Sequence, residues 1–139
     1  MAAAVISEHE HVRILWDPEL GAVLMEWLAP TGGPPFRAAL EEGLAAARVR
    51  RATKWLADLR WLGVIARSDE AWIQEDWLPR LVDAGIRHYA MVRPESSKAQ
   101  VSIRELLLGS SVQEILGSEA IITQSFEAVE DARRWLEEQ

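Results

Sequence analysis

The segment that most constrains the fold is a short apolar run within residues 53–60, in which Asp58 interrupts a series of large side chains. Its apolar residues are nearly continuous rather than alternating, which is typical of a strand covered on both faces. A loop follows this run, and the next helix is predicted to begin at Ser68 or Asp69. A buried strand that leads into a crossover helix predicts an α/β fold with parallel strands.

The segments before this strand predict a hairpin and a helix. Residues 1–10 are small or polar and are expected to be loose at their start. Two strands are predicted over 12–16 and 22–28, joined by the turn sequence Asp-Pro-Glu-Leu-Gly. The Pro- and Gly-rich cluster at 29–34 ends the hairpin, and a helix is predicted over 35–50 because proline suits a first helical turn.

Glycine and proline give sharper expectations inside the helices. Gly43 lies within the first helix, where it costs about 1 kcal/mol relative to alanine, so it indicates close packing on a neighbour. The second helix is predicted to end at Ala84, with Gly85 as its left-handed stop. Pro79 lies inside this helix and should kink it, since proline removes one backbone hydrogen bond.

The remaining segments alternate in the same way. A strand is predicted over 87–92, helical structure over 100–116 in one or two pieces broken near Gly109, a strand over 120–126, and a closing helix from Ala128. The order is β-β-α-β-α-β-α-β-α. It predicts a mixed five-stranded sheet packed with about four helices, in one domain that spans 1–139, with right-handed crossovers between its last strands.

Composition excludes several classes of function. The chain has no cysteine, so it has neither a disulfide framework nor a thiolate site. Its net charge of −7 argues against nucleic acid as a partner. No apolar run is long enough to span a membrane, and the first residues lack the pattern of a signal peptide, so a cytoplasmic protein is the simplest interpretation.

Four features of the chain carry a resemblance to a known family: the strand with Trp55-Leu56-Ala57-Asp58, the aromatic helix Trp72 to Pro79, Gly85 before the next strand, and the ending from Phe126 to Leu136. Together they resemble the SpoIIAA-like family of STAS domains. The chain looks most similar to the bacterial branch described as STAS and CRAL-TRIO-like. The resemblance covers nearly the whole chain, and it implies the SpoIIAA-like fold.

In anti-sigma-factor antagonists of this family, a serine at the start of the helix after this strand is phosphorylated, which releases the partner protein. Ser68 occupies a similar place, but the family's Asp-Ser-Ser-Gly pattern is replaced by Arg67-Ser68-Asp69-Glu70. A phosphate on Ser68 would face two acids. An N-cap role for Ser68 is therefore favoured over a switch.

Seven tryptophans are many for 139 residues. Some members of the SpoIIAA-like branch are thought to bind lipid-like ligands and to associate with membranes, which offers a use for them. Ligands of open α/β sheets bind outside the carboxyl ends of parallel strands. Our hypothesis is a cleft at that edge, lined by Trp61, Trp72 and Trp77, although Trp77 is better explained as core.

The other polar residues give weaker signals. Asp58 could be a ligand-binding or functional acid, but a structural role is favoured, in which Arg60, Lys54 or a helix N-terminus pairs with it. The three histidines have no metal-ligand spacing, so no metal is expected. No nucleophile motif and no matched acid and base are present, so an enzyme is the least favoured class.

Two functions stay open. The first is a non-catalytic domain that binds an apolar or lipid-like small molecule without a cofactor. In one form of this hypothesis the domain also associates reversibly with a membrane. The second is a regulatory STAS module that binds a protein partner. An exposed tryptophan face or the edge of the first hairpin could also pair two chains in a homodimer.

Overall fold

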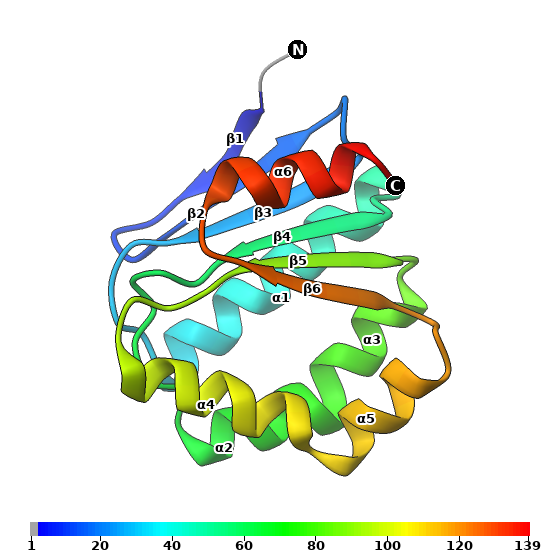
Figure 1. The fold of residues 1–139 in the computed structure, drawn as a ribbon. Helices are drawn as coiled ribbons and strands as arrows, with labels where there is room; N and C mark the ends of the chain where they lie inside the picture. Colours follow the sequence, from blue (N-terminus) through cyan, green and yellow to red (C-terminus); the bar gives the residue numbers. More distant parts are fainter. Residues whose placement is uncertain (1–2) are drawn as a thin grey trace.

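A mixed sheet of six strands, covered by helices on both faces, organises the computed structural model, which describes residues 3–139 (Figure 1). The strands lie in the sheet in the order in which they occur in the chain. Their bounds are β1 Ala4–Glu8, β2 Val12–Asp17, β3 Ala22–Trp27, β4 Lys54–Asp58, β5 His88–Val92 and β6 Ile122–Phe126.

The predicted α/β class is confirmed, but the predicted number of five strands is wrong. The additional strand is β1, which pairs antiparallel with β2 and has an irregular register between Val5 and Ser7. The sequence analysis predicted no strand within residues 1–10, which it described as small or polar and loose at their start. Pairing along β2 orders it at the edge of the sheet, where Val5 stays half exposed. Met1 and Ala2 lie outside the described residues.

The strands from β3 to β6 are parallel, as the alternation of strands and helices predicts. Each connection moves to the next strand in the same direction across the sheet. Right-handed connections that move in one direction place their helices on one face. These helices are α1 Gly33–Arg50, α2 Arg67–Trp72 with its continuation, α4 Ser97–Leu108 and α5 Ser110–Gly117.

The helix after β4 is continuous but irregular. A π-helical turn, η1 Ile73–Trp77, connects α2 to α3 Leu78–Asp83. Pro79 follows this turn directly, and a proline ring crowds the carbonyl four residues before it. The wider π-helical turn gives that carbonyl room. The irregularity expected at Pro79 therefore takes the form of a π-helical turn just before it. Gly85 has a φ of 111° and ends the helix as predicted.

The described part of the chain contains five helices when 67–83 is taken as one, so the expectation of about four was low. The helical segment near 100–116 divides at Gly109 into α4 and α5. The last helix, α6 Val129–Glu137, covers the other face of the sheet. There Ala132 and Leu136 are fully buried among strand residues such as Leu56 and Ala90.

Candidate functional site

An apolar cavity of about 70 Å³ lies between the sheet and the helices of the face that carries α1, α3, α4 and α5. Two of its lining residues carry a hydroxyl group, Thr123 and Tyr89. The lining residues are Met25, Trp27, Phe36, Leu40, Trp55, Ala57, Leu59, Leu62, Ile65, Ile73, Trp77, Leu78, Tyr89, Met91, Ile103, Leu106, Leu107, Val112, Leu116 and Thr123. The cavity therefore offers van der Waals contacts rather than groups for acid–base chemistry.

Two indole rings and a phenol form part of the cavity wall. Trp55 meets Trp77 edge to face at 5.4 Å between ring centroids. On its other side Trp55 is stacked with Tyr89 at an interplanar angle of 6°. Burial raises the pKa of the Tyr89 phenol, and its hydroxyl makes no hydrogen bond within residues 3–139.

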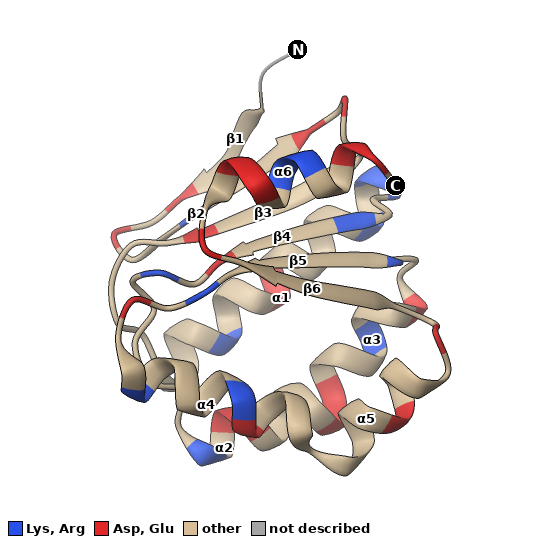
Figure 2. Cartoon of the chain, viewed as in Figure 1, with Lys and Arg blue, Asp and Glu red and all other residues tan. Residues whose placement is uncertain are grey.

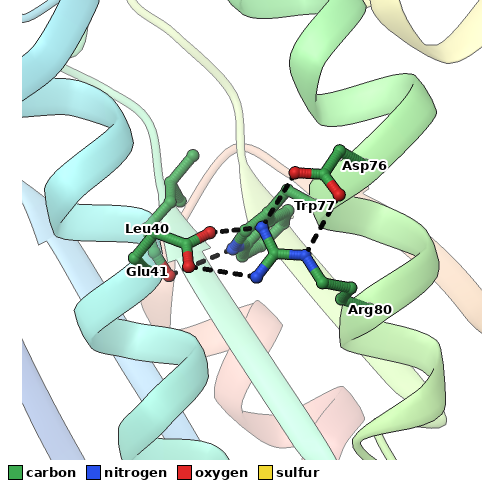
Figure 3. Close-up of polar contacts among 5 residues, drawn as sticks. All are labelled: Leu40, Glu41, Asp76, Trp77 and Arg80. Atoms are coloured by element: carbon green, nitrogen blue, oxygen red, sulfur yellow. Dashed lines mark hydrogen bonds and ion pairs between the residues drawn. The ribbon is translucent and has the colours of Figure 1, made fainter.

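The position of Trp77 is fixed by the π-helical turn and by helix α1. The indole Nε1 donates a hydrogen bond to the carbonyl oxygen of Leu40 at 3.0 Å (Figure 3). Beside it, Arg80 binds Glu41 of α1 and Asp76 of its own helix (Figure 3). These carboxylates, Glu41 first, raise the pKa of the Arg80 guanidinium. The α1–α3 pair thus holds one side of the cavity in place.

A larger hollow of about 340 Å³ lies beside the cavity, between α4 and the ends of β5 and β6. Its polar lining residues are Arg93, Gln100, Arg104 and Ser125, and its remaining residues are Met91, Pro94, Ile103, Leu107 and Leu108. We call it the α4–β6 groove. Met91, Ile103 and Leu107 line both the groove and the cavity, so these three side chains separate the two spaces.

The structure separates the three tryptophans that the sequence analysis placed in one cleft. Trp77 is 2% exposed and lines the cavity. Trp61 is 51% exposed, in the loop after β4, and lines neither the cavity nor the groove. Trp72 is half-buried, lies outside both linings, and carries the guanidinium of Arg37 over its ring at 5.3 Å from the centroid.

Asp58 lies at the carboxyl end of β4 and is 4% exposed. Its two carboxylate oxygens accept hydrogen bonds from Arg60 Nε at 2.9 Å and from Arg60 Nη2 at 2.8 Å. Such a two-point contact is the strong form of a carboxylate–guanidinium pair. The expected pairing of Asp58 with Arg60 is confirmed.

Ser68 is exposed at the start of α2. The helix begins at Arg67 with Ala66 as its N-cap, so the expectation that Ser68 caps the helix is wrong. The next residue, Asp69, is buried and accepts hydrogen bonds from the Gly33 backbone N–H at 2.9 Å and from Arg37 Nε at 2.8 Å. Asp69 therefore fastens α2 to the start of α1.

No residues within 3–139 form a cluster of three or more His, Asp or Glu side chains that could hold a metal ion. His9 stacks on His11 at 5.9 Å and binds Glu42 through Nε2 at 2.8 Å. His88 lies elsewhere, edge to face with Trp135.

The groove arginines were missed by the sequence analysis. Arg93 follows β5 and Arg104 lies in α4, so nothing in their spacing along the chain indicates that they line one hollow.

Comparison of the chain with protein-family models, with curated proteins and with solved structures gives no match. Among residues 3–139, no helix combines the length and the apolar character that crossing a membrane requires.

Proposed function

We propose that this protein is a non-catalytic binding domain for an apolar or lipid-like small molecule. The observation that carries the proposal is the apolar cavity beneath the sheet and its contact with the α4–β6 groove through three shared side chains. Ligand sites are concave, mostly apolar and have few polar groups, and the cavity and groove together have this character.

The size of the cavity limits what it can hold. An apolar cavity of ~150 Å³ engineered into another protein stays dry and binds benzene. The present cavity, at about 70 Å³, has room for a smaller apolar group. A longer ligand must therefore extend into the groove, past Met91, Ile103 and Leu107. Methionine is the most adaptable of these side chains, since its unbranched chain changes rotamer easily.

A reversible membrane contact is part of the proposal, together with a cytoplasmic location. The loops after β3 and β4 are joined by a hydrogen bond from the Thr31 N–H to the Leu62 carbonyl at 3.2 Å. They expose Leu28, Trp61 and Val64 at 44%, 51% and 55%. An indole beside exposed aliphatic groups is a typical membrane-interface composition.

A regulatory STAS module that binds a protein partner is the second candidate. The observation that favours it is the exposure of Ser68, where a kinase can reach the hydroxyl. Arg37 already donates a hydrogen bond to the Ser68 carbonyl at 3.0 Å and could pair with a phosphate there. Phosphopeptide mapping of protein purified from its own host would detect modified Ser68, and its absence under all growth conditions would remove this candidate.

The binding proposal is tested by tryptophan fluorescence and by mass spectrometry of lipids extracted from the purified protein. A panel of fatty acids, fatty alcohols and phospholipids should include compounds that change the emission of the cavity tryptophans Trp27, Trp55 and Trp77. The variant Ala57→Val fills part of the cavity, so it should weaken such binding. Ala45→Val is the matched control, because it makes the same substitution at an exposed alanine of α1 outside the cavity lining, and its variant should bind as the wild type does. A panel without any response would refute the proposal.

A further inference from the structure

We propose that the α4–β6 groove binds the anionic head, a carboxylate or phosphate, of an amphiphile whose apolar chain enters the cavity. This inference rests on the proposed function and specifies the class of ligand. The groove supplies the charge, and the cavity supplies the apolar surface.

The first argument is charge. Two arginines, Arg93 and Arg104, line the groove of a chain whose net charge is −7. Neither β6 nor the other groove lining carries an acidic residue, and Figure 2 shows β6 without charged residues. A planar guanidinium matches the oxygens of a carboxylate or phosphate in two-point contacts.

The second argument is that both guanidinium groups can accept a ligand. The Arg104 side chain makes no hydrogen bond or ion pair within residues 3–139. Arg93 is paired with Glu127 at 3.2 Å, but the Glu127 side chain is 86% exposed. An exposed ion pair of this kind is worth roughly 0–1 kcal/mol, so a bound anion can replace it easily.

The third argument is the neutral donor at the same place. The hydroxyl of Ser125 lines the groove and makes no hydrogen bond within the described residues. Ser125 is paired in register with Met91 of β5, one of the three side chains between groove and cavity. A head group held by Ser125 and the arginines would therefore lie next to the boundary that its chain must cross.

The fourth argument is the difference in volume. The groove, at about 340 Å³, is much larger than the cavity, at about 70 Å³. A ligand with its head and the first part of its chain in the groove and its chain end in the cavity fits both spaces. The reverse orientation would bury a charge among apolar side chains, which is strongly unfavourable.

The test compares three ten-carbon probes by isothermal titration at concentrations below micelle formation: decanoate, decyl phosphate and decanol. Acetate and inorganic phosphate serve as head groups without a chain. The test variant carries both Arg93→Gln and Arg104→Gln. The matched control is Arg134→Gln, a substitution of an exposed arginine on the opposite face of the sheet. Circular dichroism and thermal unfolding establish that each variant is folded.

Wild-type protein should bind decanoate or decyl phosphate at least tenfold more tightly than decanol, and added salt should reduce this difference. The double variant should lose the preference while it keeps its affinity for decanol, and Arg134→Gln should behave as the wild type. Acetate and phosphate alone should bind at least a hundredfold more weakly than the chained anions.

Equal affinity for decanol and the chained anions in the wild type would overturn the head-group inference and leave the proposed function standing. Unchanged anion affinity in the folded double variant would do the same. If none of the three chained probes bound, both the inference and the proposed function would fail.

Discussion

The most informative perturbation is the same substitution made on the two faces of the sheet. Ala57 of β4 is 2% exposed and lines the cavity. Ala90 of the neighbouring strand β5 is fully buried on the other face, in the cluster that contains Ala132 and Leu136 of α6. Replacement of each alanine by valine adds two methyl groups at a buried strand position, where a β-branched side chain suits the backbone.

The expected energies have opposite signs. Ala57→Val places its methyl groups in existing empty space, and two buried carbons at about 0.8 kcal/mol each stabilise the fold by about 1.5 kcal/mol. Ala90→Val forces the extra volume against the buried side chains of α6, and overpacking of this kind costs roughly 1–3 kcal/mol. The two variants should therefore differ by about 3 kcal/mol in their free energy of unfolding.

The assay is urea unfolding followed by far-UV circular dichroism, with the slope of the transition compared among the three proteins. A similar slope makes the midpoints comparable. Equal destabilisation of Ala57→Val and Ala90→Val would show that the space beside Ala57 does not accept two methyl groups.

Three further predictions concern single side chains. Trp77→Phe removes an indole N–H donor and part of the cavity wall, so it should lower the free energy of unfolding in urea by about 2 kcal/mol. Trp61→Phe should change the free energy of unfolding by less than about 0.5 kcal/mol. Equal losses would contradict the placement of the two rings. Asp69→Ala removes two hydrogen bonds from a buried carboxylate and should cost about 2 kcal/mol by the same assay, against about 0.3 kcal/mol for Asp131→Ala, whose ion pair is exposed. Burial raises the pKa of Glu70, so its carboxyl contributes stability below its unfolded-state pKa that is lost as the pH rises through the folded-state pKa. Glu70→Gln should therefore stabilise the protein at pH 7 more than at pH 4, and a gain that does not shrink at low pH would contradict this.

Much of the fold could be predicted because local patterns and tertiary structure agree. The run at 53–60 forms the buried strand β4, and Gly85 ends its helix in the left-handed region. The expectation of close packing at Gly43 is confirmed, since a Cβ built there would lie 2.8 Å from both Met25 Sδ and Trp55 Cη2. In each case one residue type is required by the backbone or by its immediate neighbours.

The strand β1 was missed because its formation depends on a partner rather than on its own sequence. Ala4–Glu8 lacks strict alternation, since three apolar residues are followed by Ser7 and Glu8, and it becomes a strand through pairing with β2. Edge strands carry a weak local signal for this reason.

The candidate site was harder to predict because an unfilled space is a property of packing among distant elements. Tryptophan content indicated an aromatic site, but the sequence could not tell which rings face a cavity. The prediction that ligands bind outside the carboxyl ends of the strands relies on a reversal of strand order, where a crevice opens. Strands β3 to β6 are added in one direction, so they have no such reversal. The cavity lies between the sheet and its helices, and the α4–β6 groove lies at the carboxyl ends of β5 and β6.

The measurement that tests the central claim most directly is the position of a bound apolar chain. Crystals grown or soaked with a fatty alcohol that carries bromine at its chain end would locate that end by anomalous diffraction. The account predicts a bromine peak inside the cavity, against Trp55, Trp77 and Ile103. Bromine peaks confined to the protein surface, or a cavity that stays empty while the alcohol binds elsewhere, would contradict it.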